Sequence, residues 1–188
     1  MKIYTKVGDE GKTMYFGCGM INKHDPRIEA LGALDELNSA LGVALCFVED
    51  AKVKNVLQEI QHDLFQVSAD LAGSKLNPES VPRVTPNHIE KLELLIDELE
   101  EKLGMPKKFI LPGGTPASSF LHLARTITRR AERSIVAVKE VVELNSDILK
   151  YVNRLSDLLY VLARQANKEL DIQEQQPIYK YMKKEDLK

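Results

Sequence analysis

Two short segments concentrate cationic and hydroxyl side chains of the kind that bind phosphate. The first, Thr5–Thr13, contains two glycines, which permit backbone conformations closed to other residues, and its lysines and threonines supply hydrogen-bond donors. Its last three residues imitate a Walker A motif, but Lys6 stands where that motif requires glycine, and the flanking strand and helix are missing. It is therefore not a P-loop, and the open alternative is a solvated, glycine-rich arm.

The second segment, Arg125–Arg133, holds four arginines and one glutamate in nine residues. At about 100° per residue, Arg125 and Arg129 share a helix face with His122, Glu132 and Arg133, while the opposite face is apolar. Arginine presents a planar fork of donors that suits phosphate oxygens. The alternative is a solvated face with internal Glu–Arg pairs. Because like charges this close repel, the pattern favours a bound anion.

Two further segments contain residues that could contact a ligand. Phe109–Pro116 is a stiff turn whose two glycines let a ligand approach the backbone, and a plain interhelix connection is its alternative. A polar stripe runs along one face of the last predicted helix. A network of hydrogen bonds between packed helices explains this stripe as well as ligand contact does. The stripe consists of Asn153, Asp157, Tyr160 and Arg164. The four histidines and two cysteines show no metal-ligand spacing.

Five amphipathic helices position these segments. Asp25, Thr85 and Thr115 each precede a proline, which predicts an N-cap followed by a proline at the first helical position. Apolar spacing extends the prediction to helices over 26–49, 51–72, 86–103, 116–138 and about 146–170. Only Lys2–Thr5 looks extended, with no second convincing strand. The sequence therefore predicts an all-α, five-helix antiparallel bundle.

Length and charge restrict the class of protein further. The 188 residues fit a single domain, divided into an N-terminal segment 1–25, a bundle 26–170 and a tail 171–188. The net charge of −2 gives no electrostatic reason to expect nucleic acid as a partner. We find no apolar run that could span a membrane, no secretory signal and too few cysteines for a disulfide framework. These features predict a soluble, cytoplasmic protein.

Taken together and in order, these segments resemble the ATP:cob(I)alamin adenosyltransferases found in propanediol utilisation and in human methylmalonic aciduria. The resemblance covers the chain up to about Asn167. It rests on Tyr4–Thr13, Lys23–Pro26, Asp35–Ser39, Gln61–Ala72, Leu111–Pro116, Arg125–Arg133 and Asn153–Asn167.

The resemblance implies a ferritin-like homotrimer with active sites between neighbouring subunits. It implies ATP and cob(I)alamin as substrates, Mg²⁺ with the ATP, and a flavoprotein reductase and an adenosylcobalamin-dependent enzyme as possible partners. The implied nucleotide contacts are Thr5, Lys6, Val7, Gly8, Asp9, Gly11, Thr13, Met14, Lys23, Arg129, Arg130, Glu132, Arg133 and Asn153. Asn153 is also the implied Mg²⁺ contact. Asp35 is implied to pair with Arg125 across the interface, and Phe109 to close the lower face of the corrin.

The implied reaction transfers the 5′-deoxyadenosyl group of ATP to cobalt. Co(I) is a strong nucleophile that attacks C5′ and displaces triphosphate in line, so no general base is required. The protein must align the two substrates and stabilise the charge growing on triphosphate, tasks that Arg125 and Arg129 suit. Excluding a lower axial ligand with Phe109 eases reduction from Co(II), because axial ligation tunes a metal's potential.

The loop after the N-terminal segment departs from the family pattern. Phe16–Met20 has Cys18 where the second glycine is common and Met20 in the usual basic region, so a positive contact from this loop is in doubt. An alternative function is an ATP-responsive corrinoid carrier or chaperone without turnover. Release of triphosphate discriminates the enzyme from the carrier.

Overall fold

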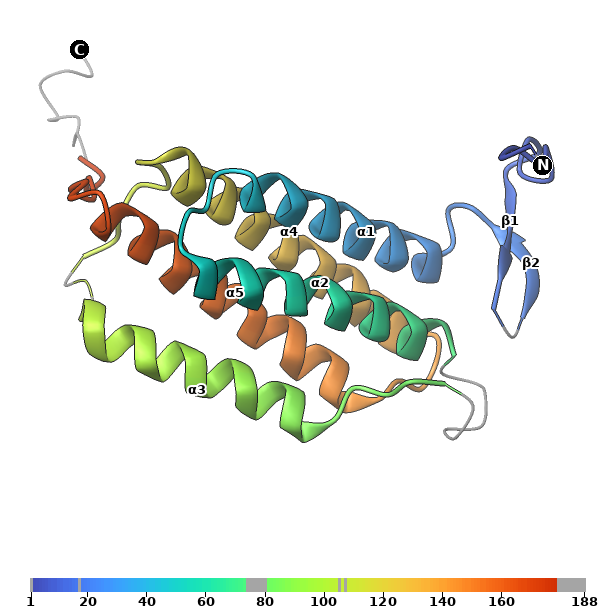
Figure 1. Cartoon of the computed structure of the whole chain (residues 1–188). Coiled ribbons are helices and arrows are strands. Elements are labelled where there is room, and N and C mark those ends of the chain that lie inside the picture. The colour runs from blue at the N-terminus through green and yellow to red at the C-terminus, as the bar shows by residue number, and fades with distance from the viewer. Residues whose placement is uncertain (1, 17, 74–80, 105, 107, 179–188) are drawn as a thin grey trace, which may run out of the picture.

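Five helices account for most of the chain in the computed structural model, which describes residues 2–178 except 17, 74–80, 105 and 107 (Figure 1). The predicted helical bundle is thereby confirmed. A small two-stranded sheet precedes it. The elements are β1 (Lys12–Tyr15), β2 (Gly19–Asn22), α1 (Pro26–Leu45), α2 (Ala51–Ala72), α3 (Pro86–Leu103), α4 (Pro116–Lys139) and α5 (Ser146–Lys168). Of the predicted tail, residues 179–188 lie outside the described part.

Side-chain caps start the helices where the sequence predicts. Asp25 Oδ1 accepts a hydrogen bond from the Arg27 N–H at 3.0 Å, and Thr115 Oγ1 accepts one from the Ser118 N–H at 3.0 Å. Each bond satisfies one of the backbone donors that a helix leaves unpaired at its start. The predicted end of the first helix was wrong by four residues, because the chain already turns after Leu45.

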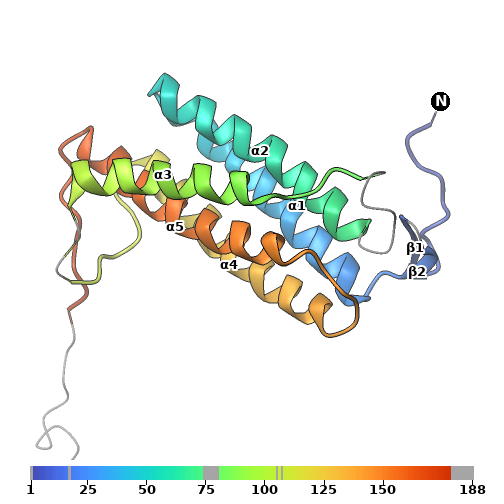
Figure 2. The ribbon, with the colours of Figure 1, turned by 90° about the horizontal axis from the view of Figure 1, so that it is seen from below.

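The helices pack in pairs along their length. α4 lies between α1 and α5, α2 packs on α1, and α3 packs on α5. Helices that follow one another in sequence run in opposite directions, as predicted. α3 and α5, however, are spatial neighbours that run in the same direction (Figures 1 and 2). No described helix is both long enough and apolar enough to cross a membrane.

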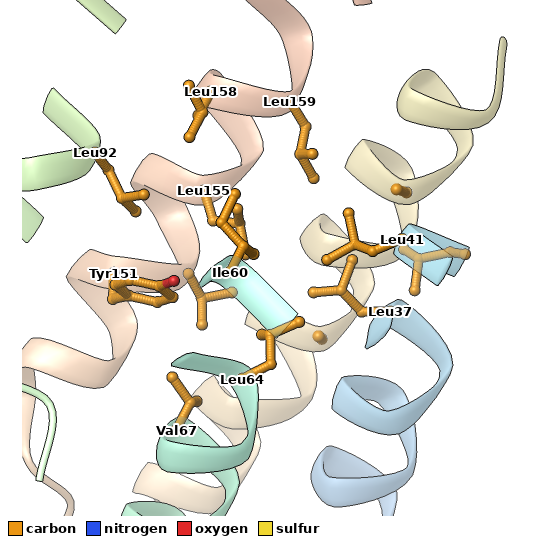
Figure 3. Close-up of a cluster of buried hydrophobic side chains, with 14 of the residues drawn as sticks. Leu37, Leu41, Ile60, Leu64, Val67, Leu92, Tyr151, Leu155, Leu158 and Leu159 are labelled. Atoms are coloured by element: carbon orange, nitrogen blue, oxygen red, sulfur yellow. The ribbon is translucent and has the colours of Figure 1, made fainter. Parts of the chain in front are cut away.

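Leucine, isoleucine and valine side chains from all five helices meet in the core, part of which is shown in Figure 3. Leu37 of α1, Leu64 of α2 and Leu155 of α5 are fully buried there. Tyr151 is also fully buried, and its hydroxyl donates to Asp63 Oδ2 at 2.9 Å, which satisfies its polar atom. Burial of these side chains fixes the faces that α4 and α5 turn outward.

The expectation of a single extended segment at Lys2–Thr5 was wrong. The strands are β1 and β2, which pair antiparallel with Thr13 opposite Ile21, and residues 2–5 form no strand. Tyr15 docks this hairpin on the bundle: it is 3% exposed, and its hydroxyl donates to the Leu71 carbonyl at 3.2 Å. Four-residue strands carry too little alternation for periodicity to reveal them.

Candidate active site

A hollow of about 300 Å³ lies between α4, α5 and the connection from α3 to α4. The connection supplies Phe109 above it, and α4 supplies Arg125 and Arg129, one helical turn apart. We call this the Phe109 hollow. Its lining consists of Phe109, Ile110, Pro112, His122, Arg125, Arg129, Ser156, Asp157 and Tyr160. The hollow therefore brings together three of the four residues predicted to be catalytic.

The two arginines of the hollow have no acidic partner within ion-pair distance among the described residues. Arg125 Nε is buried and has no hydrogen-bond partner among the residues that the structure describes. Burial, reinforced by the charge of Arg129, lowers the pKa of Arg125. Arginine nevertheless stays charged at neutral pH, so two cations face a single carboxyl group, Asp157, in the hollow, and this excess of positive charge favours an anion.

Neutral aromatic and imidazole groups flank these cations. His122 is 2% exposed, and burial together with Arg125 lowers its pKa to about 4, so the ring is neutral at pH 7. Desolvation raises the pKa of Tyr160, whose ring lies 6.0 Å from that of His122. Desolvation also raises the pKa of Asp157, and Arg154 and Arg129 oppose this shift. The two cations of the hollow are therefore flanked by a neutral imidazole, a tyrosine and one carboxyl group.

The N-terminal arm, defined here as residues 2–11, is built in a different way. It is mostly exposed and folds through turns, in which the Asp9 N–H donates to the Lys6 carbonyl and the Gly11 N–H to the Gly8 carbonyl, both at 3.3 Å. Lys6 has a φ of 62° and Gly11 a φ of 76°, both in the left-handed region. Such turns aim successive backbone N–H groups toward a common side, as anion-binding nests do.

Lys23 joins the arm to the hairpin. Its N–H donates to the Gly11 carbonyl at 2.9 Å, and a Cβ on Gly8 would lie 3.0 Å from the Lys23 Nζ. The structure therefore places the predicted lysine against the predicted glycine. The other arm-side candidates, Thr13 and Met14, lie on β1, and Met14 is 68% exposed.

The remaining candidates on α4 make contacts within the subunit. Arg130 pairs with Glu36 of α1. Arg133 donates to the Arg129 carbonyl at 2.9 Å. Glu132 Oε1 accepts from Asn153 Nδ2 at 3.0 Å, which connects α4 to α5. Of the Glu–Arg pairs considered as the alternative to a bound anion, the described residues contain one for Arg130, with a glutamate on another helix, and none for Arg125 or Arg129.

The arm and the Phe109 hollow lie apart within one subunit. The hairpin stands at the end of the bundle where α1 begins, while the connection that carries Phe109 runs at the opposite end (Figure 1). No hydrogen bond or ion pair joins the arm to the hollow among the residues the structure describes. Asp35 is exposed on α1 and forms no pair with Arg125 in that same part of the chain.

Sequence reasoning missed several residues around these sites. Ser156 and Ile110 line the hollow because of how α5 and the connection dock, which no local pattern reveals. Arg27 stacks 5.0 Å from the Tyr15 ring centre and forms an ion pair with Asp25 at 2.8 Å. It therefore places a cation near the loop in which Met20 replaces the usual basic residue. The polar stripe on α5 divides: Asp157 and Tyr160 face the hollow, whereas Arg164 is buried and paired with Glu174.

The described residues contain no cluster of three or more histidine, cysteine, aspartate or glutamate side chains that could hold a metal ion. Asn153 Oδ1 already accepts from Arg154 at 2.8 Å. These residues therefore do not form a complete protein-built cage. They fit Mg²⁺ only as an ion that arrives with polyphosphate and keeps most of its water, which is how Mg²⁺ commonly binds.

The class of protein that these features indicate is a helical bundle with an anion site, because two arginines beside an exposed phenylalanine form no ion pair within the described part of the chain. The family model described as cobalamin adenosyltransferase matches residues 3–166, and the chain belongs to that family. The corrinoid adenosyltransferase of Mycobacterium leprae is 45% identical over 179 residues, which cover 91% of this chain and 94% of that protein. The corrinoid adenosyltransferase PduO of Salmonella typhimurium is 42% identical over 165 residues, 87% of this chain but 49% of that protein.

A solved structure gives the same result for the fold. It is a variant of the PduO-type ATP:corrinoid adenosyltransferase from Lactobacillus reuteri, complexed with cobalamin and ATP. The two chains are 40% identical and superpose with a TM-score of 0.88, over 94% of this chain and 96% of that one.

Proposed function

We propose that this protein is a corrinoid adenosyltransferase, which transfers the 5′-deoxyadenosyl group of ATP to the cobalt of cob(I)alamin and releases triphosphate. Within a family of this activity, one observation supports the assignment most strongly. Arg125 and Arg129, which form no ion pair with any described residue, line a hollow together with Phe109, which is 80% exposed. The arginines could bind the triphosphate, and the exposed ring of Phe109 could pack against the corrin.

The reaction requires in-line attack by Co(I) on C5′ as the bond to triphosphate breaks. The electron pair of Co(I) forms the cobalt–carbon bond, and the pair of the broken bond leaves with the triphosphate. No proton moves, so the work of the protein is alignment and charge stabilisation. Arg129 and Arg125 stabilise the leaving charge. The proposed nucleotide contacts are Thr5, Lys6, Val7, Gly8, Asp9, Gly11, Thr13, Met14, Lys23, Arg130, Glu132, Arg133 and Asn153.

Phe109 has a separate role in this proposal. Its exposed ring closes the lower face of the corrin and keeps an axial ligand away from cobalt. A cobalt without that ligand is reduced from Co(II) to Co(I) more easily, because axial ligation sets the potential. The neutral state of His122 is compatible with this apolar surface.

The active unit that we propose is a homotrimer, in which the arm of one subunit covers the Phe109 hollow of its neighbour. The separation of the two regions within one chain supports this arrangement (Figure 1). The exposed Asp35 and the partnerless Nε of Arg125 suit an ion pair across that interface. We further propose that the protein works in the cytoplasm, where the free Cys18 and Cys46 stay reduced, and exchanges substrate with a flavoprotein reductase and product with an adenosylcobalamin-dependent enzyme.

Mg²⁺ enters this proposal bound to the triphosphate of ATP, where it neutralises charge on the leaving group. Asn153 is its proposed protein contact, through an oxygen that must exchange its hydrogen bond from Arg154 for the ion or for one of its waters. Glu132 lies beside Asn153 and orients it.

The direct test follows the absorbance of chemically prepared cob(I)alamin after addition of ATP and Mg²⁺. We expect conversion to adenosylcobalamin with one triphosphate released for each corrinoid. A corrinoid carrier would bind both ligands, and would be stabilised against heat by each, without releasing triphosphate. Binding without triphosphate release would therefore contradict the enzymatic proposal.

A further inference from the structure

The connection between α3 and α4, residues 104–115, carries Phe109 and is fastened to α5 near its end at α4. Asn167 is 2% exposed; its Nδ2 donates to the Gly113 carbonyl and its Oδ1 accepts from the Thr115 N–H, both at 2.9 Å. A Cβ on Gly114 would lie 2.2 Å from Asn167 Oδ1, so the backbone there lies directly against the amide. One buried side chain thus fixes the last residues of the connection.

The chain that follows α5 holds the other part of the connection. Residues Ile172–Gln175, which we call the strap, turn back along α5. The Gln175 carbonyl accepts from the Leu111 N–H at 2.7 Å. Glu174 accepts from Arg164 Nε at 3.0 and 3.2 Å, and the NH1 group of Arg164 donates to the Gly104 carbonyl at 2.8 Å. Arg164 therefore binds the start of the connection and the strap together.

Burial makes this ion pair a strong tether. The side chain of Arg164 is 8% exposed and that of Glu174 is 20% exposed, so neither charge is well solvated. Removing one partner from such a pair leaves a charge buried without compensation. The Arg164 guanidinium also lies 5.9 Å from the centre of the Tyr160 ring, which lines the Phe109 hollow.

Phe109 depends on these tethers because its own packing cannot hold it. A side chain that is 80% exposed makes few contacts, so its position is set by the backbone of the connection. Among the residues that the structure describes, two hydrogen bonds hold that backbone on either side of Phe109: the Leu111 N–H donates to the strap, and the Gly104 carbonyl accepts from Arg164. The family match ends at residue 166, so the strap lies beyond it.

We propose that Arg164 and Glu174 are positioning residues for the reaction, which act by holding the strap against the connection so that Phe109 stays over the hollow. This inference rests on the proposed function. It predicts that breaking the ion pair slows adenosylation that starts from Co(II), because the reduction of Co(II) needs Phe109. The steps that need the arginines should be unaffected.

The first test measures amide hydrogen exchange in the ligand-free protein. In Glu174→Gln we expect the Leu111 amide to exchange about tenfold faster, because its acceptor on the strap is released, while the Thr115 amide on Asn167 keeps its rate. Glu174→Asp retains the charge and should stay near the wild-type rate. Glu169→Gln is the matched control, since that exposed carboxylate accepts from Gln165 and from no other side chain in the described part of the chain. Unchanged exchange at Leu111, or equal acceleration at both amides, would overturn the tether.

The second test uses turnover. Glu174→Gln should slow adenosylation that starts from Co(II) about fivefold or more, and leave the rate from prepared Co(I) and the KM for ATP within about twofold. Added to Phe109→Ala, the Glu174→Gln change should not slow the reaction from Co(II) any further, because both changes remove the same positioned ring. Additive losses, or equal slowing from Co(II) and Co(I), would contradict the proposal. A wild-type protein inactive with Co(I) would refute the proposed function instead, and the exchange result would still decide the tether.

Discussion

The N-terminal arm and the Phe109 hollow, which we propose to bind parts of one substrate pair, are built in different ways. The arm is mostly exposed backbone with glycines and lysines, held to the hairpin by hydrogen bonds such as that from Lys23 to Gly11. The hollow is walled by two helices packed along their length, so the helix that carries its cations is in place before a ligand arrives. A preorganised site lowers the barrier to reaction, whereas an arm that orders around its ligand mainly sets affinity.

Arg129→Ala should have the largest effect. It removes a preorganised cation that we place on the leaving triphosphate, so kcat should fall by about 100-fold or more. The far-ultraviolet circular dichroism should be unchanged, because the side chain is exposed and forms no ion pair in the described part of the chain. Turnover near the wild-type rate would remove Arg129 from the mechanism.

Phe109→Ala tests the other part of the hollow. Adenosylation that starts from Co(II) should slow by about tenfold or more, since the change of axial ligation bears on reduction alone. The rate from chemically prepared Co(I) should stay within about threefold of wild type. Equal losses in the two assays would mean that the ring serves binding and not reduction.

Lys23→Ala should affect the arm and therefore affinity. We expect the KM for ATP to rise about tenfold with kcat nearly unchanged, as for a contact made equally in the ground and transition states. The control is Lys54→Ala, an exposed lysine on α2. A fall in kcat at saturating ATP would show that the arm, like the hollow, acts in the transition state.

Substitution of His122 should have the smallest effect on turnover, because we expect it to act on stability alone. Its pKa is about 4 in the folded protein against an ordinary 6.5, so the unfolded chain binds the proton more readily. The resulting stability is full above about pH 6.5 and is lost as pH falls toward 4, at most about 3 kcal/mol. His122→Gln should therefore reduce the dependence of the free energy of unfolding on pH between about 4 and 6.5, whereas substitution of the exposed His62 by Gln should leave it unchanged.

Local chemistry made most of the fold predictable. Asp25, Asp50 and Thr115 cap helices through bonds two or three residues away, so the sequence around each start suffices. The face shared by Arg125 and Arg129 follows from helical periodicity. The pairing of Arg164 with Glu174 could not be predicted, because it depends on the chain turning back after α5. The hairpin could not be predicted either, because Tyr15 docks it on Leu71, 56 residues further along the chain.

In the proposed trimer the arm of one subunit and the hollow of another form one site, and this sharing can be tested by mixing two inactive proteins. Arg129→Ala keeps its arm, and a Lys6→Ala, Lys23→Ala double variant, assayed at low ATP, keeps its hollow. Coexpressed in equal amounts, they should form trimers in which about one quarter of the sites have both parts intact, and activity should return to about that fraction. If arm and hollow act within one chain, no mixed trimer contains an intact site, and activity no higher than that of the parents would contradict the account.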